Sequence, residues 1–240
     1  MIFSKANTKL KKLAKSKLGQ KILKGRKIYS FDLLSGYSCP FAKDCKTRVI
    51  KTKNGFKIKD SSSKFRCYAA STEVLFPKVY NKRKVNYSLV KSLSQKQIVQ
   101  LLLRHLPKNA GIIRIHTSGD FFKKSYFLAW VEVAKSHPEI LFYAYTKAIK
   151  YWRDSLSIIP SNLILTASYG GKQDNLIGDL KSVRVVYSKY KAKKLRLPLS
   201  IDDTHAILNK SFAILIHGTQ PKGKLARIIC KYRRQNVKSR

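Results

Sequence analysis

Acidic side chains are scarce in this 240-residue chain, which has 12 Asp and Glu against 51 Lys and Arg and a formal net charge of +39. A surface with so much positive charge repels itself unless a polyanion or counterions neutralise it. Phosphate backbones attract such a surface strongly. We therefore expect nucleic acid as a partner, with DNA and RNA equally open.

Long apolar runs are also missing. None approaches the roughly 18–20 residues of a membrane-spanning helix, so no span is expected. Only four cysteines are present, and no apolar signal-peptide core follows Met1. This argues against a disulfide scaffold and favours a reducing compartment, expected here to be the cytoplasm. Hydrophobic residues make up 44% of the chain, which excludes a disordered tail and allows a core.

Both ends of the chain are basic. Residues 1–28 hold ten Lys or Arg, no acid, and leucines at roughly helical spacing. They predict a basic amphipathic arm for an anionic surface, with a solvated surface helix as the plain alternative. A mitochondrial presequence would look similar and would place the protein in an organellar matrix. Residues 227–240 form a second basic tail, and residues 29–226 are expected to be one domain with a cysteine segment at 35–67.

That domain alternates strand and helix patterns. Five strands are expected at residues 112–116, 140–146, 162–168, 183–187 and 212–217. Helices are expected over residues 88–106 and 125–136, with shorter connections between the other strands. Repeated βα units predict an α/β fold with a parallel sheet, open or closed into a partial βα barrel.

The strand ends change together from apolar to polar residues. Ligands bind at the carboxyl ends of parallel strands, so these endings predict one polar site, although ordinary turn chemistry gives similar residues. The candidate ligand-binding residues are Ser118, Gly119, Asp120, Thr146, Lys147, Ser168, Gly170 and His217.

Two acidic positions have a structural alternative. Asp120 would either orient a ligand or cap the helix that starts near Lys123. The run Asp202-Asp203-Thr204-His205 is either an acid–base pair or, more commonly for such a run, a helix N-cap.

Three cysteines are the sharpest feature. Cys39 and Cys45 are separated by five residues, and Cys67 follows after twenty-one more. Lys43, Lys46 and Arg48 would favour the thiolate form, which binds metal. Three thiolates suit an iron–sulfur cluster that exposes one iron. Zinc and unligated buried thiols stay open as alternatives, and so does a role for Cys230 as a fourth ligand.

Basic residues that lie in the termini or beside aromatic residues are the candidates for phosphate contacts, with the aromatic rings able to stack on bases. They are Lys11, Lys12, Lys15, Lys82, Arg83, Lys150, Arg153, Lys231, Arg233 and Arg234.

The sequence resembles the bacteriophage gene product 88 family over roughly residues 30–226. The matching motifs lie at residues 35–45, 65–67, 114–122, 142–147, 165–171 and 216–221. The resemblance implies a phage, plasmid or other mobile-element origin and says little about activity.

A more distant resemblance is to radical S-adenosylmethionine (SAM) enzymes, with three cysteines after the first strand and a Gly-acid loop after the second. It implies a 4Fe–4S cluster at Cys39, Cys45 and Cys67 whose open iron chelates SAM, with residues 118–120 at the SAM amino group. It further implies reductive SAM cleavage to a radical that attacks nucleic acid, with Asp120, Lys147 and His217 as catalytic residues. The competing hypothesis is a non-catalytic nucleic-acid-binding protein of replication, packaging or RNA–protein assembly, with a structural metal or none.

Overall fold

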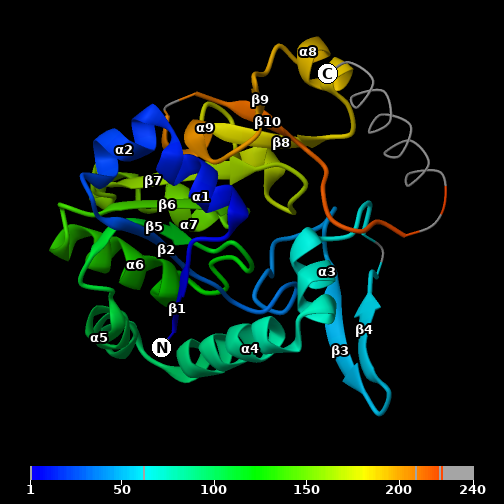
Figure 1. The fold of residues 1–240 in the computed structure, drawn as a ribbon, viewed down its shortest axis with the longest axis horizontal. Coiled ribbons are helices and arrows are strands. Elements are labelled where there is room, and N and C mark those ends of the chain that lie inside the picture. The colour runs from blue at the N-terminus through cyan, green and yellow to red at the C-terminus, as the bar shows by residue number, and fades with distance from the viewer. Residues whose placement is uncertain (1, 62, 209, 222, 224–240) are drawn as a thin grey trace.

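The computed structural model, which describes residues 2–61, 63–208, 210–221 and 223, is an α/β fold. Its eight-stranded, mostly parallel sheet curls into a half-barrel (Figure 1). The strand order is β1-β2-β5-β6-β7-β8-β10-β9, and only β1 runs antiparallel to its neighbour. The sheet strands are β1 (Phe3–Lys5), β2 (Lys27–Phe31), β5 (Ala110–Ile115), β6 (Leu141–Thr146), β7 (Leu163–Ser168), β8 (Ser182–Val186), β9 (Leu199–Ser200) and β10 (Phe212–Leu215).

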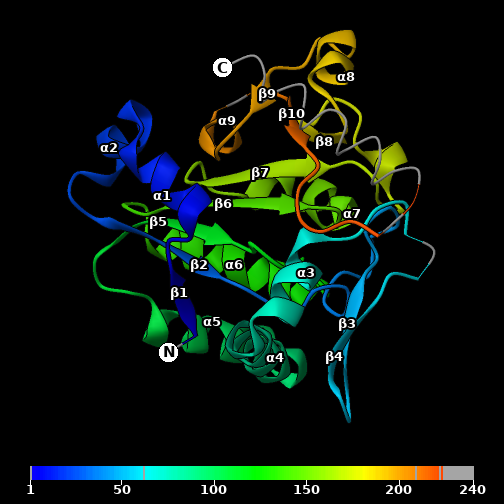
Figure 2. The ribbon, with the colours of Figure 1, turned by 45° about the vertical axis from the view of Figure 1, so that its right-hand side comes forward.

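A separate antiparallel hairpin, β3 (Arg48–Thr52) and β4 (Gly55–Lys59), projects from the cysteine segment at one side of the sheet (Figures 1 and 2). The helices are α1 (Thr8–Lys15), α2 (Lys17–Leu23), α3 (Tyr68–Leu75), α4 (Pro77–Ser92), α5 (Gln95–His105), α6 (Lys124–Ser136), α7 (Ile149–Arg153), α8 (Lys189–Lys194) and α9 (Thr204–Ile207). Short 3₁₀ turns cover Leu156–Ile158 and Asp174–Leu176. No helix among the described residues has the length and apolar character needed to cross a membrane.

All five predicted strands are confirmed, as β5, β6, β7, β8 and β10, and the helix at 125–136 is confirmed as α6. The predicted helix over residues 88–106 is wrong as a single element. It divides into the end of α4 and the whole of α5, because Ser94 starts a new helix with a capping box to Gln97.

The N-terminal segment, expected as a basic arm, packs against the sheet. β1 pairs with β2, with Phe3 opposite Phe31, and Leu10 and Leu13 of α1 are fully buried. The leucines at helical spacing form the buried face of α1, while Lys11, Lys12 and Lys15 are exposed on the other side. Apolar burial therefore holds this segment, and its charge lies on the outside.

The two faces of the sheet are covered differently. Helices α4, α5, α6 and α7 pack on one face and form the larger core with Phe31, Ile115 and Phe142 (Figure 2). Helices α1, α2 and α9 cover part of the concave face, where Ile112 and Tyr143 pack with Leu10. The rest of the concave face is left for the site described next.

Candidate functional site

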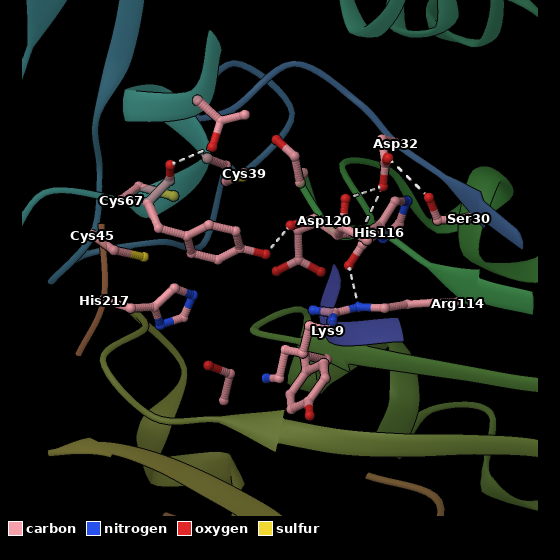
Figure 3. A pocket seen from close by; sticks show the side chains of 18 of the residues that line it. Lys9, Ser30, Asp32, Cys39, Cys45, Cys67, Arg114, His116, Asp120 and His217 are labelled. Atoms are coloured by element: carbon pink, nitrogen blue, oxygen red, sulfur yellow. Dashed lines mark hydrogen bonds between the residues drawn. The ribbon is translucent and has the colours of Figure 1, made fainter. Parts of the chain in front are cut away.

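A cavity of about 560 Å³ opens at the carboxyl ends of β5, β6 and β7 and along the concave face of β8 and β10 (Figure 3). It brings together most of the side chains that the sequence predicted as a site. The predicted residues that line it are Cys39, Cys45, Cys67, Ser118, Gly119, Asp120, Thr146, Lys147, Ser168 and His217. They come from segments far apart in the chain, so the alignment of strand ends unites them.

The loop that carries Cys39 and Cys45 is fixed to the loop after β7. The carbonyl of Gly170 accepts hydrogen bonds from the backbone N–H groups of Lys43 (3.1 Å) and Asp44 (2.9 Å), and Ala42 forms a bridge with Gly171. Gly170 has φ +90°, and a Cβ there would lie 3.0 Å from the Asp44 side chain. Gly170, predicted to lie at a cofactor, is not among the residues that line the cavity; it lies behind the cysteine loop and positions that loop.

Cys67 is the N-cap residue of α3, and its N–H donates to Thr47 Oγ1 at 3.1 Å. Burial and the neighbouring Cys45 raise the pKa of Cys67 to about 12, although the N–H groups of Ala69 and Ala70 act in the opposite direction. Burial, Asp120 and the other two cysteines also raise the pKa of Cys39. Burial thus favours the neutral thiol at Cys39 and Cys67, contrary to the expectation that Lys43, Lys46 and Arg48 would favour the thiolates.

Within the described residues, no three His, Cys, Asp or Glu side chains are arranged to share a single metal ion. The three cysteines are free and half-buried. Cys230, the other cysteine of the chain, lies outside the described residues.

Asp120 joins two strand ends. Its carboxylate accepts hydrogen bonds from the N–H of Phe121 (2.8 Å), the hydroxyl of Thr146 (2.7 Å) and the N–H of Lys147 (2.8 Å). It does not cap α6, whose N-cap Lys123 makes no side-chain cap bond. Burial raises the pKa of Asp120, and these three hydrogen bonds oppose that effect. Asp120 therefore holds the loop after β5 against the end of β6, at the cavity wall.

Lys147 extends along the strand ends and donates to Ser168 Oγ at 2.7 Å. Burial acts to lower the pKa of Lys147, but nearby Cys45 and Asp120, with the other cysteines, raise it overall. Its ammonium group is therefore a fixed positive charge among the thiols. Lys147 and Ser168 thus form one polar wall of the cavity.

The loop after β5 packs tightly against the cysteine segment. Ser118 Oγ donates to Glu73 at 3.2 Å, and the fully buried Glu73 also accepts from Ser35 Oγ (2.7 Å) and Arg83 Nη1 (3.1 Å). Gly119 has φ +96°, and a Cβ there would lie 2.6 Å from Leu33. Ser118 and Gly119 therefore fix this loop as well as line the cavity.

A buried charge network lies on the concave wall. Asp203 Oδ2 accepts hydrogen bonds from Arg114 Nη1 and from the Tyr143 hydroxyl (2.8 Å). Asp203 Oδ1 accepts from the Tyr145 hydroxyl (3.1 Å), and Lys9 Nζ lies 2.8 Å from the same oxygen. Burial alone would raise the pKa of Asp203, but Arg114 and Lys9 lower it to about 2. Asp203 is thus ionised and connects α1, β5 and β6.

The loop after β10 closes over the cavity. Gln220 accepts a hydrogen bond from the N–H of Arg66 (2.9 Å) and donates to its carbonyl (3.0 Å), while Ser71 Oγ donates to the Thr219 carbonyl at 3.2 Å. The ring of His217 lies 4.3 Å from that of Tyr68. We call residues 216–221 with their contacts to residues 66–71 the clasp. It places His217 beside the Cys67 end of α3.

The predicted phosphate-contacting residues are not all at the surface. Arg83 is 6% exposed and bound to Glu73, and Lys82 Nζ donates to the Phe3 carbonyl, because both lie on the side of α4 that faces the fold. Lys150 and Arg153 are paired with Asp154 and Asp179. Lys231, Arg233 and Arg234 lie outside the described residues. The freely exposed candidates are therefore those of α1.

Sequence reasoning missed the cavity residues Lys9, Arg114 and Tyr145 and gave no specific role to Asp203. The sequence did hold a signal for Arg114, because it is the one charged residue in the β-branched run 112–115. In the structure Arg114 is 7% exposed. The run 202–205 does start a helix, with Asp203 as the N-cap residue of α9, but the Asp203 side chain makes no cap hydrogen bond, and Asp202 accepts from the N–H of Thr204 (2.8 Å). Asp203, freed from capping, takes part in the network.

Sequence comparisons relate this chain to a phage protein family. No solved structure matches the chain. The Gene 88 protein of Mycobacterium phage L5 is 31% identical over 90 residues, which cover 34% of this chain and 38% of that protein. A family model described as gene product 88 matches residues 1–237. Because that match extends over nearly the whole chain, this protein belongs to the phage gene product 88 family.

Proposed function

We propose that this protein is nucleic-acid-associated, holds a 4Fe–4S cluster at Cys39, Cys45 and Cys67, and acts on nucleic acid as a radical SAM-like enzyme. One observation carries the proposal: cysteines from two separate parts of the chain line a single cavity at the carboxyl ends of parallel strands. That is the position where βα folds bind their ligands.

The donor set fits such a cluster. A cluster takes one cysteine at each of its irons, so its ligands need not converge on one point as they do around zinc. Three cysteines leave one iron without a protein ligand, which is where SAM would bind. When bound, the cluster and SAM would supply one-electron radical chemistry.

The protein's own groups would bind and orient the ligands. The ammonium group of Lys147 would offset the negative charge of cluster-bound thiolates, because its pKa is raised and it lines the same cavity as the three cysteines. Asp120 Oδ2 accepts one hydrogen bond, from the N–H of Lys147, and a carboxylate oxygen can accept two. We assign its second acceptor position to the SAM amino group, with Thr146, Ser168 and residues 118–119 as the surrounding polar wall.

His217 is the candidate for moving a proton. The surrounding protein desolvates the His217 ring and lowers its pKa, although the residue is exposed at the mouth of the cavity, so the imidazole is neutral at neutral pH. Nδ1 lies 3.2 Å from the Leu215 carbonyl, an arrangement in which Nδ1–H donates and Nε2 keeps a lone pair. A neutral ring with a free lone pair is a suitable base at the substrate.

Nucleic acid fits the charge of the chain, and the cavity sets the scale of what can enter. About 560 Å³ is within the range of roughly 300–1,000 Å³ of small-ligand sites. A duplex cannot enter, so chemistry would require a single nucleotide turned out of its stack or a chain end. The exposed Lys11, Lys12 and Lys15 of α1 would hold the phosphates outside.

The second candidate is a non-catalytic nucleic-acid-binding protein of replication, packaging or RNA–protein assembly, favoured by the net charge of +39 and the basic exposed side of α1. Its affinity would depend on salt, with log affinity falling by about 0.9 per neutralised duplex phosphate for each log unit of salt. Binding that vanishes well below physiological salt would remove this candidate.

The decisive experiment measures iron, acid-labile sulfide and the visible spectrum of protein purified without oxygen. We expect about four irons per chain, as for one 4Fe–4S cluster, with a broad brown absorbance. The Cys39→Ala/Cys45→Ala/Cys67→Ala variant should lose both. A Cys230→Ala variant should keep them, and its loss of iron would instead identify a fourth ligand and close the open iron position. Wild-type protein with neither iron nor zinc would end the metal proposal.

A further inference from the structure

The donors around Asp203 fill its acceptor positions. A carboxylate has about four acceptor positions. Arg114, Lys9, Tyr143 and Tyr145 occupy them. Any further donor on the two cations must therefore find its acceptor elsewhere.

Arg114 has such a donor and is held rigidly. Its Nε donates to the His116 carbonyl at 3.3 Å, its Nη1 donates to Asp203, and its guanidinium lies 4.9 Å from the centre of the Tyr145 ring. Nη2 has no hydrogen-bond partner in the part of the chain that the structure describes. Arg114 is 93% buried and extends into the cavity next to Lys9 (Figure 3). A fixed guanidinium with an unused edge is suited to an oxyanion.

The charge at this wall points the same way. Lys9 and Arg114 share one carboxylate, which leaves one positive charge uncompensated. The side chain of Lys9 is 28% exposed, so its ammonium group can still be reached. A structural ion pair would need only one of these cations. The second is available to an anion that enters the cavity.

Flat and apolar surfaces lie around the same cations. The His217 and Tyr68 rings line the same cavity, on the side of the cysteines, and Val183, Val185 and Ile214 of β8 and β10 form an apolar wall. In Figure 3, the cysteines lie on one side of this space and Arg114 and Lys9 on the other. Cations with aromatic and apolar walls match a phosphate joined to a base.

We propose that Lys9 and Arg114 bind the phosphate of a single nucleotide whose base lies along the Tyr68 and His217 side of the cavity. This inference rests on the proposed function, since it names the substrate class of the same cavity. The nucleotide can be free or can be the 5′ end of a single strand, and both sources present the same phosphate and ring.

The test is calorimetric titration with adenosine 5′-monophosphate, adenosine and inorganic phosphate at fixed ionic strength. We expect the monophosphate to bind more tightly than adenosine. Lys9→Met should weaken it by about tenfold, the size of one charge-assisted hydrogen bond. Lys21→Met removes the same charge from the exposed side of α2 and should leave affinity unchanged. The Arg114→Met variant should lose binding if it folds. If it does not fold, the Lys9→Met result alone tests the proposed phosphate site.

Single-stranded tetranucleotides with and without a 5′-phosphate distinguish the two sources, with the same Lys9 dependence expected for the source that is used. Equal losses in the Lys9 and Lys21 variants would show diffuse charge attraction and overturn the inference. So would equal binding of adenosine and its monophosphate, or no binding of any of these probes. Iron is measured in the same preparation: an iron-containing protein that fails this test refutes only the nucleotide site. Specific binding by iron-free protein refutes only the cluster.

Discussion

The same strands build two different faces of the half-barrel. On β5, Ile113 and Ile115 belong to the core under α4–α7, whereas Arg114 between them lines the cavity. On β6, Phe142 and Ala144 face that core, and Tyr143 and Tyr145 bind Asp203. Period-two alternation thus gives the strands an apolar side and a polar one, both buried. Burial alone does not tell a core residue from a cavity-lining one in this sheet.

The two faces differ in how they gain stability. The helix-covered face relies on apolar area and ring contacts, such as Trp130 with Phe31 at 5.5 Å and with Phe3 at 6.3 Å. The concave face has to compensate buried charges with one another. Buried ion pairs add little net stability, but breaking one is costly. We therefore expect substitutions on the first face to change stability alone, and those on the second to change stability, pH dependence and ligand binding together.

Trp130→Ala should have the largest effect on stability. Trp130 is fully buried among Phe3, Phe31 and Phe142, so its loss leaves a cavity that costs about 4 kcal/mol of unfolding free energy. Urea unfolding followed by circular dichroism measures this cost. Metal content per folded molecule should not change, because Trp130 lies on the other face. A loss of less than about 1 kcal/mol would show that the core closes over the gap, contrary to the packing argument.

Asp203→Asn comes next and should cost about 3 kcal/mol at neutral pH, because it leaves Arg114 and Lys9 without their shared anion. The pKa of Asp203 is about 2, below its unfolded value of about 3.9, so its stabilisation is complete above the unfolded value. It is lost as the pH falls through the folded value. The gap between wild type and variant should therefore narrow between pH 4 and pH 2.

Asp202→Asn is the matched control for that measurement. The Asp202 side chain accepts from the N–H of Thr204, and asparagine keeps an oxygen for the same bond. Its unfolding free energy should stay close to that of the wild type at each pH. A gap between wild type and the Asp203 variant that stays constant down to pH 2 would show that Asp203 is not held as an anion.

The sequence was sufficient for the elements with strong local patterns. The apolar runs predicted five neighbouring parallel strands, and the change to polar residues at their ends predicted that Asp120, Lys147 and Ser168 belong to one site. The cysteines joined that site only through the resemblance to radical SAM enzymes. The strands at the two ends of the sheet were not predicted from the sequence. β1 and β9 are short, with three and two residues, and their pairing is set by tertiary contacts.

The concave network was missed for a related reason. Lys9 sits in a lysine-rich stretch and Asp203 in an acidic run that suggests a helix cap, so neither differs from its neighbours in the sequence. Only the fold brings α1 and the start of α9 together over β5 and β6. Charge composition likewise treated Arg83 as one more basic residue, although Glu73 holds it in the interior. Pairing of buried charges over long sequence separations leaves no local pattern to recognise.

Gln220→Ala should have the smallest effect on overall stability and sharpens the comparison, because the clasp closes the concave face mainly with polar contacts. The change removes both hydrogen bonds between Gln220 and the Arg66 backbone. We expect about 1 kcal/mol or less in unfolding free energy, but about tenfold faster hydrogen exchange at the Arg66 amide, because that amide opens locally. In Gln220→Glu the new side chain still accepts from the Arg66 N–H but cannot donate to the Arg66 carbonyl. The exchange rate of the Arg66 amide in this variant should therefore lie between those of the wild type and Gln220→Ala. Unchanged exchange at Arg66 in both variants would mean that apolar packing, rather than this pair of hydrogen bonds, holds the loop over the cysteines, and the two faces would then be less different than their side chains suggest.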